Sequence, residues 1–227
     1  MSKNLFITGT GTDVGKTYIS GLITKKLKEN GYNIGYFKTA MSGNIRNDNG
    51  ELLPGDAIQV KNMSKISQSL DSMCPYVYEN PLSPHLASRI EGNYIDMNVV
   101  KKYFYDLNSN YDFLTIEGSG GIACPLSFDN CKLQLIDIVK MFNLPSIIVA
   151  DAGLGTINNV VLTAEYMKAN GLTVKGIIFN HFHKGNVMEE DNKFMCEYLT
   201  GLKVLGCVEQ NDNSIDIDIE TLISLYN

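Results

Sequence analysis

The nine residues Gly9-Thr10-Gly11-Thr12-Asp13-Val14-Gly15-Lys16-Thr17 decide the fold that the sequence predicts. They follow an apolar run at 4–8, which predicts a buried strand, and they lead into a helix predicted over 15–30 that Gly31 ends. Glycines let backbone N–H groups converge on phosphate oxygens, and a helix N-terminus adds partial positive charge. The stretch therefore predicts a phosphate-binding loop.

Two side chains at the end of the loop suit a nucleoside triphosphate and its metal ion. Lys16 can reach the β and γ phosphates, and the Thr17 hydroxyl can coordinate Mg2+. Five residues separate Gly9 from Gly15, one more than in the usual pattern, so the loop is a lengthened variant. The alternatives are a glycine-rich turn without a ligand and a dinucleotide-binding turn. The latter expects an acidic residue at the end of the second strand, which here ends in Lys38.

Length, composition and charge describe a single domain with no general affinity for nucleic acid. The 227 residues are 44% hydrophobic and 19% charged, which fits one domain over 1–227. A net charge of -6 gives no attraction to nucleic acid or to an anionic membrane, and no apolar run is long enough to span a bilayer. Five scattered cysteines argue against a disulfide framework or a zinc site. Together with the lack of a signal-peptide pattern, they predict a cytoplasmic protein.

Short apolar runs alternate with stretches of helical periodicity along the rest of the chain. Strands are predicted near 34–38, 113–117, 146–150, 174–180 and 204–208, and helices over 96–108, 133–142, 156–170, 187–200 and 217–225. Buried strands separated by helices imply an α/β fold: a P-loop NTPase-like, mainly parallel sheet with helices on both faces. Ligands in such folds bind at the carboxyl ends of the strands, so polar residues there are the candidates for chemistry.

Three charged residues suit a phosphoryl-transfer site. Lys38 ends the second strand and can bring a second cation to transferring phosphoryl oxygens; the alternative is an ordinary solvated lysine. Glu117 ends the strand at 113–117 and can hold Mg2+, and the glycines at 118–121 leave room for phosphates. Asp56 opens a predicted short helix, where it can be a metal ligand or a helix N-cap.

Asn180 ends the strand at 174–180, where its amide can offer a donor and an acceptor to a purine. The following His181 and Phe182 do not continue as the Asn-Lys-x-Asp pattern of guanine-specific P-loop proteins, so adenine is predicted. A turn-forming amide is the alternative for Asn180. His85, His181 and His183 share no ligand spacing with a cysteine pair, which argues against zinc.

In their order and spacing, these segments resemble the dethiobiotin synthetase family over nearly the whole chain. The lengthened loop is similar to the family's loop, and 38–43 (Lys-Thr-Ala-Met-Ser-Gly) looks like its Lys-Pro-x-x-Ser/Thr-Gly segment. The segments 81–85 (Pro-Leu-Ser-Pro-His), 117–121 (Glu-Gly-Ser-Gly-Gly) and 154–158 (Leu-Gly-Thr-Ile-Asn) fit its pattern as well, as does Asn180. The resemblance implies an ATP-dependent ligase of biotin synthesis. In this reaction 7,8-diaminononanoate takes up CO2 as a carbamate, which attacks the γ-phosphate of ATP, and the resulting anhydride cyclises.

The resemblance also implies a role for each matching residue. Lys16, Lys38 and Thr12 would act on the carbamate and the transferring phosphoryl group, and Ser42 would contact the diamine. Mg2+ would be held by Thr17, Asp56 and Glu117. The residues expected to bind ATP are Asp13, Val14, Gly15, Lys16, Thr17, Tyr18, Asp56, Glu117, Gly118, Ser119, Gly120, Asn180, Val208, Glu209 and Gln210. Because the family is a homodimer with substrate at the subunit junction, the neighbouring active site would receive Gly155, Thr156, Ile157 and Asn158 against the substrate carboxylate.

Two other functions are compatible with a phosphate-binding loop. A partition or cargo-positioning ATPase would use the same fold as a molecular switch, although the extra lysine that such proteins often carry is absent between Gly9 and Val14. A nucleotide-binding module without catalysis would not need two lysines and two metal carboxylates. ATP turnover independent of the diamine would favour the switch, and tight binding without turnover would favour the module.

Overall fold

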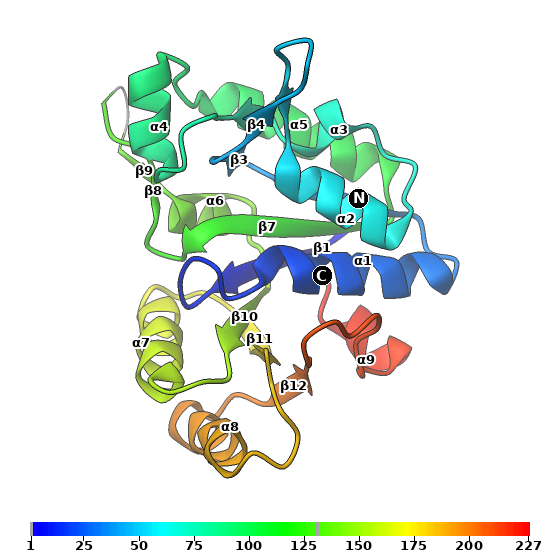
Figure 1. Cartoon of the computed structure of the whole chain (residues 1–227), viewed down its shortest axis with the longest axis vertical. Helices are drawn as coiled ribbons and strands as arrows, with labels where there is room; N and C mark the ends of the chain where they lie inside the picture. Colours follow the sequence, from blue (N-terminus) through cyan, green and yellow to red (C-terminus); the bar gives the residue numbers. More distant parts are fainter. Residues whose placement is uncertain (1, 130–131) are drawn as a thin grey trace.

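The computed structural model describes residues 2–129 and 132–227, and its centre is a six-stranded sheet (Figure 1). All neighbouring strands of this sheet are parallel, in the order β12-β11-β10-β1-β7-β2. Each strand was predicted from the sequence, so the P-loop NTPase-like class is confirmed. The strands are β1 (Lys3–Gly9), β2 (Ile34–Lys38), β7 (Phe113–Gly121), β10 (Ser146–Asp151), β11 (Val174–Asn180) and β12 (Val204–Cys207).

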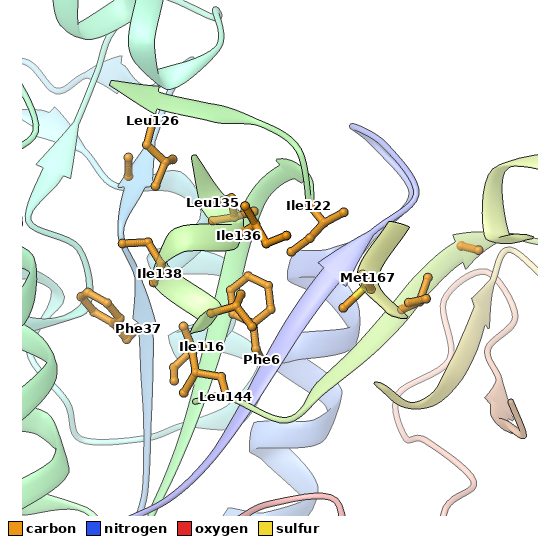
Figure 2. Close-up of a cluster of buried hydrophobic side chains, with 14 of the residues drawn as sticks. Phe6, Phe37, Ile116, Ile122, Leu126, Leu135, Ile136, Ile138, Leu144 and Met167 are labelled. Carbon is orange, nitrogen blue, oxygen red and sulfur yellow. The ribbon is translucent and has the colours of Figure 1, made fainter. Parts of the chain in front are cut away.

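The side chains of the central strands alternate between two buried layers, one on each face of the sheet. On β1, Leu5 and Ile7 belong to one layer, whereas Phe6 belongs to the other. Strands that are covered on both faces consist of continuous apolar residues, which is why the sequence shows no polar alternation there. Figure 2 shows the layer around Phe6, where Phe37 of β2 and Ile116 of β7 meet side chains from α6.

Helices cover both faces of the sheet, as predicted. One layer contains apolar side chains of α1 (Lys16–Glu29), α2 (Gly55–Ser64), α3 (Leu70–Met73) and α9 (Ile219–Ser224). The other contains those of α4 (Pro84–Glu91), α5 (Met97–Asn110), α6 (Leu135–Met141), α7 (Thr156–Ala169) and α8 (Val187–Thr200). Helices α1 and α2 lie side by side (Figure 1), and α2 contacts β2, the strand at one edge of the sheet.

Three pairs of short strands lie outside the main sheet and were not predicted. They are the parallel pair β3 (Ala40–Met41) and β6 (Tyr76–Val77), and the antiparallel pairs β4 (Ile45–Arg46) with β5 (Leu52–Leu53) and β8 (Pro125–Ser127) with β9 (Leu133–Gln134). Runs of two or three residues are too short to produce a periodic pattern. The sequence also did not predict α3 and α4, or that β7 continues through 118–121, where Gly121 pairs with Gly9.

None of the helices in the described part of the chain combines the length and the apolar composition needed to span a bilayer. Cys74, Cys124, Cys196 and Cys207 are free thiols, whereas Cys131 lies outside the described residues.

Candidate active site

A cavity of about 390 Å3 opens at the carboxyl ends of β1, β2 and β7. Parallel strands bring the loops that follow them to the same edge, which explains why segments distant in sequence meet there. Most of the predicted site residues line it, including Ser42, which was predicted to contact the diamine: Thr12, Asp13, Gly15, Lys16, Thr17, Tyr18, Lys38, Ser42, Asp56, Glu117, Ser119 and Gly120.

The phosphate-binding loop takes its shape from left-handed backbone at two positions. Gly15, the N-cap of α1, has φ 92°, and Asp13 has φ 59°. Lys16 follows as the first residue of α1, and its Nζ donates to the carbonyl oxygen of Gly11 at 2.7 Å. Burial lowers the pKa of Lys16 to about 8, and repulsion from the Lys38 ammonium adds to this effect. The loop therefore leads directly into a buried lysine at the N-terminus of α1.

Lys38 bridges two carboxylates. Its Nζ lies 2.6 Å from Asp56 Oδ2 and 2.6 Å from Glu117 Oε1. Lys38 and Glu117 are partners in the register of β2 and β7, so both side chains leave the sheet on the same side. Lys38 is only 6% exposed, which rules out the ordinary solvated lysine.

The protonation of this cluster follows from its ion pairs. Burial alone would lower the pKa of Lys38, but attraction by Glu117 and Asp56 raises it above the usual value of a lysine. Burial would likewise raise the pKa of Asp56, yet the Lys38 ammonium lowers it. Lys38 is therefore a cation and Asp56 an anion at neutral pH. Asp56 lies in the first turn of α2 and Pro54 is the N-cap, so the N-cap alternative for Asp56 is wrong.

Glu117 is the most buried carboxylate of the site, at 1% exposure. Besides Lys38, it accepts hydrogen bonds from the Thr17 hydroxyl at 2.8 Å and from the Tyr36 hydroxyl at 2.9 Å. Tyr36 was not predicted as a site residue. Its position two residues before Lys38 on a strand, which puts both on one face, was the available signal.

The oxygen atoms in this cluster fit Mg2+. The Thr17 hydroxyl and the carboxylates of Asp56 and Glu117 converge on the Lys38 side of the cavity, and hard divalent cations prefer such ligands. In the described residues no group of three or more His, Cys, Asp or Glu side chains is arranged to bind a metal. Two carboxylates are nevertheless enough for an ion that also binds phosphates and water.

The β3 segment closes another side of the cavity. The Ser119 hydroxyl donates to the carbonyl oxygen of Ala40 at 2.7 Å, which fixes 40–42, including Ser42, against β7. Gln59 also lines the cavity but was not predicted as a site residue. It lies three residues after Asp56 on α2, and this spacing, which puts both side chains on one face of the helix, could have identified it. Gly118 does not line the cavity. A Cβ there would lie 2.7 Å from Leu135 Cδ2, so this glycine permits packing under the site.

Asn180 lies against the phosphate-binding loop. Its Nδ2 donates to the Val14 carbonyl oxygen at 3.3 Å, and a Cβ on Gly15 would come within 2.0 Å of the same nitrogen. The residue is only 2% exposed, and its Oδ1 has no hydrogen-bond partner among the described residues. The Asn180 side chain therefore stabilises the phosphate-binding loop and does not form a turn at the end of β11. Its Oδ1 is left as a hydrogen-bond acceptor to which no described residue donates.

Two groups of predicted residues lie away from the cavity in this chain. Gly155, Thr156, Ile157 and Asn158 form the N-terminus of α7, after β10. Val208 is 1% exposed and packs in the layer with α1 and α9, and its backbone pairs with 179–182. Glu209 and Gln210 follow in an exposed segment that the Tyr18 hydroxyl reaches at the Asp212 carbonyl oxygen.

The comparisons with known proteins agree with this geometry. The family model described as an AAA domain matches residues 3–217. An ATP-dependent dethiobiotin synthetase of Brachyspira hyodysenteriae is 48% identical over 98% of this chain and 99% of its own length. The chain belongs to the dethiobiotin synthetase family.

Other dethiobiotin synthetases show similar coverage. The Clostridium perfringens protein is 46% identical over 98% of this chain and 97% of its own length, and a Clostridium botulinum protein is 42% identical over 100% and 99%. The resemblance inferred from the motifs is confirmed.

Solved structures agree on the fold alone. The septum site-determining protein MinD of Pyrococcus horikoshii, complexed with Mg-ADP, gives a TM-score of 0.52 at 14% identity over 93% of this chain and 82% of that chain. A ParA family ATPase of Chlorobium tepidum gives 0.53 at 13% identity over 99% and 89%.

Proposed function

We propose that this member of the dethiobiotin synthetase family converts 7,8-diaminononanoate, CO2 and ATP into dethiobiotin, ADP and phosphate. The observation that carries the proposal is the cluster in which Lys16, Lys38, Asp56 and Glu117 converge on one cavity beside a phosphate-binding loop. A nucleotide switch with no chemistry beyond hydrolysis has less use for a second buried lysine that holds two carboxylates.

The reaction needs charge neutralisation more than covalent help from the protein. An amine of the diamine adds to CO2 and loses a proton to give a carbamate. A carbamate oxygen attacks the γ-phosphorus, and the bond from that phosphorus to the ADP oxygen breaks. The second amine then attacks the carbamoyl carbon and loses a proton, and the bond from that carbon to the phosphate oxygen breaks, so that phosphate leaves as the ureido ring closes. Lys16 and Lys38 stabilise the carbamate and the transferring phosphoryl group, and Thr12 hydrogen-bonds the carbamate.

Thr17, Asp56 and Glu117 are the residues that would hold Mg2+. When bound, the ion neutralises charge on the phosphate oxygens. Glu117 is already oriented for this role by the hydroxyls of Thr17 and Tyr36. Because Lys38 contacts both carboxylates, its ammonium compensates their charge in the protein without ligands.

The nucleotide lies along the loop formed by Asp13, Val14, Gly15, Lys16 and Thr17, with Tyr18, Ser119 and Gly120 beside it and Gly118 beneath them. Asn180 contacts the base, because its buried Oδ1 lacks a donor and the 6-amino group of adenine supplies one. Glu209 and Gln210 contact the base from the exposed segment. For Val208, a contact through the backbone is compatible with its buried side chain.

The diamine lies beside Ser42, and its carboxylate meets the N-terminus of α7 from a second subunit. The α7 residues 155–158 do not line the cavity of their own chain, so a homodimer is needed to bring them to substrate. In this arrangement backbone N–H groups and the positive end of the helix dipole bind the carboxylate. A single domain over 1–227 and a cytoplasmic location stay predictions.

Phosphate release by the purified protein with Mg-ATP tests the proposal. We expect release only when 7,8-diaminononanoate and bicarbonate are both present, together with a product of the mass of dethiobiotin. Release that ignores the diamine would contradict the ligase and support a switch. Tight ATP binding without turnover under any of these conditions would support a binding module instead.

A further inference from the structure

A short chain of polar side chains runs beside the phosphate-binding loop at the ends of β10 and β11. Asp151 and Asn180 are register partners on these two strands, and His181 follows Asn180 directly. His181 Nδ1 lies 2.8 Å from Asp151 Oδ2, and His181 Nε2 lies 3.2 Å from Asn180 Nδ2. None of these contacts involves the residues that carry the phosphoryl-transfer chemistry.

The chemistry of each atom fixes the direction of the hydrogen bonds. The Asp151 carboxylate only accepts, so Nδ1 of His181 carries the proton of this hydrogen bond and is its donor. An amide NH2 group only donates, so Nε2 of the same ring accepts a hydrogen bond from Asn180 Nδ2. Val14 supplies a second acceptor, its carbonyl oxygen, to that nitrogen. Both neighbours therefore require the NH2 group of Asn180 on the side of the loop.

The consequence is the orientation of the Asn180 amide. With NH2 held between Val14 and His181, Oδ1 points away from the loop, and it is the atom without a partner among the described residues. If the ring carried its proton on Nε2, this proton would face the Asn180 NH2 group. Turning the amide over would relieve that clash, but it would set Oδ1 against the Val14 carbonyl oxygen.

His181 also has a backbone conformation that needs a reason. Its φ is 54°, in the left-handed region that residues with a side chain rarely adopt. Residues in this conformation are enriched at functional sites. The strain here places an imidazole ring between Asp151 and Asn180.

We propose that Asp151 and His181 are positioning residues that hold Asn180 Oδ1 toward the base and thereby set the preference for a purine with a 6-amino group. The inference rests on the proposed contact between Asn180 and the base. A 6-amino group donates to Oδ1, whereas the 6-oxo group of inosine triphosphate would meet it as a second acceptor. Discrimination then depends on the histidine tautomer that Asp151 selects.

Asp151→Asn is the sharpest test. Asp151 Oδ1 also accepts from the Gly153 backbone N–H at 2.8 Å, and the oxygen of an asparagine can keep this bond. The asparagine NH2 then donates to His181 Nδ1, which moves the ring proton to Nε2. 15N NMR of the histidine rings in the full chain without nucleotide should show Nδ1 protonated in the wild type and Nε2 protonated in the variant. A wild-type ring protonated on Nε2, or a variant ring that keeps the wild-type tautomer, overturns the proposal.

Turnover with ATP and with inosine triphosphate gives the functional readout. In Asp151→Asn we expect the ratio of kcat/KM for ATP to that for inosine triphosphate to fall about 3- to 10-fold, the scale of one hydrogen bond. The fall should come from KM for ATP, with kcat retained. In the double variant Asp151→Asn/His181→Gln, the glutamine can present an oxygen near the Nε2 position, so the ratio should return toward the wild type.

Asn180→Ala separates the base contact of Asn180 from the positioning role of Asp151 and His181. If this variant lowers the ratio while Asp151→Asn changes the tautomer and not the ratio, the base contact stands and the positioning role is overturned. If Asn180→Ala leaves the ratio unchanged, the proposed base contact itself is wrong. If the wild type shows no diamine-dependent turnover, the proposed reaction itself is wrong.

Discussion

Lys16 and Lys38 are both buried lysines, but they differ in what surrounds them. Lys38 has two carboxylate partners, whereas Lys16 donates to the Gly11 carbonyl oxygen and forms no ion pair with the described residues. The two lysines should therefore respond to substitution in opposite ways in the protein without ligand. Lys16 destabilises the free protein until a phosphate group reaches it, and Lys38 stabilises it.

Replacing Lys16 by Met should stabilise the protein and abolish its activity. The pKa of Lys16 is about 8 in the folded protein and about 10.5 when unfolded, so the unfolded chain binds more protons between these values. Wild-type stability then rises with pH across this window, and Lys16→Met lacks this rise. We expect a gain on the order of 1 to 3 kcal/mol at pH 7 that shrinks toward pH 10.5.

Urea unfolding of both proteins at pH 7 and pH 10 measures the stability difference, and phosphate release measures activity. Turnover should fall by about 100-fold or more. A less stable Lys16→Met protein at pH 7 would show that the lysine is not an uncompensated charge.

Replacing Lys38 should have the reverse effect on stability, because Glu117 would stay buried without its cation. Lys38→Met should lower the free energy of unfolding by about 3 kcal/mol. In Lys38→Met/Glu117→Gln the buried charge is gone as well, so most of that stability should return. Turnover should remain reduced by roughly 100-fold or more in both proteins. Denaturation and phosphate release, measured on the same samples, give the stability and the turnover of each variant. If the double variant recovers turnover as well as stability, Lys38 has only a structural role.

At the scale of elements, the conformation of the phosphate-binding loop requires glycine at position 15 but not at position 11. Gly15 has φ 92° and a Cβ there would lie 2.0 Å from Asn180 Nδ2, whereas a Cβ at Gly11 meets nothing within 4 Å. Gly15→Ala should raise KM for ATP by about 10-fold or more, since strain and the clash displace the loop N–H groups. Gly11→Ala is the matched control and should stay close to the wild type. Measuring KM for ATP in the two variants tests this prediction. Equal KM values would show that the conformation and close contact of Gly15 do not control nucleotide binding.

The elements also separate what the sequence predicts from what it does not. Strands such as β10 and β11 were predicted because continuous apolar runs between helices have one structural explanation. Lys38 and Glu117 were each predicted at the ligand-binding edge because the carboxyl ends of parallel strands meet there. The sequence could not show that Lys38 bridges Asp56 and Glu117, because α2 is positioned by packing against α1. Nor could it show the contact between His181 and Asp151, which depends on strand register.

At the scale of the whole molecule, the proposed arrangement would take each active site from two chains. Lys16 follows β1 at the start of α1, whereas the N-terminus of α7 follows β10, and residues 155–158 do not line the cavity that Lys16 lines. Asn158 is exposed at the third position of α7, where Asn158→Asp would favour the helix dipole and repel a substrate carboxylate. We expect this variant to keep its stability and to raise KM for the diamine without changing KM for ATP.

Mixing Lys16→Met, which is inactive, with Asn158→Asp, which is impaired at low diamine concentration, tests whether the second chain completes the site. In a heterodimer of Lys16→Met and Asn158→Asp protomers, one site carries both changes and the other carries neither. If dimers exchange subunits freely, half of them are mixed, so activity at low diamine concentration should recover to about a quarter of the wild type per protomer. Sedimentation of the wild type and activity before and after mixing provide the measurements. A dimer that shows no recovery after verified exchange would place the substrate carboxylate within one chain, and a monomer with full activity would remove α7 of a second subunit from the site.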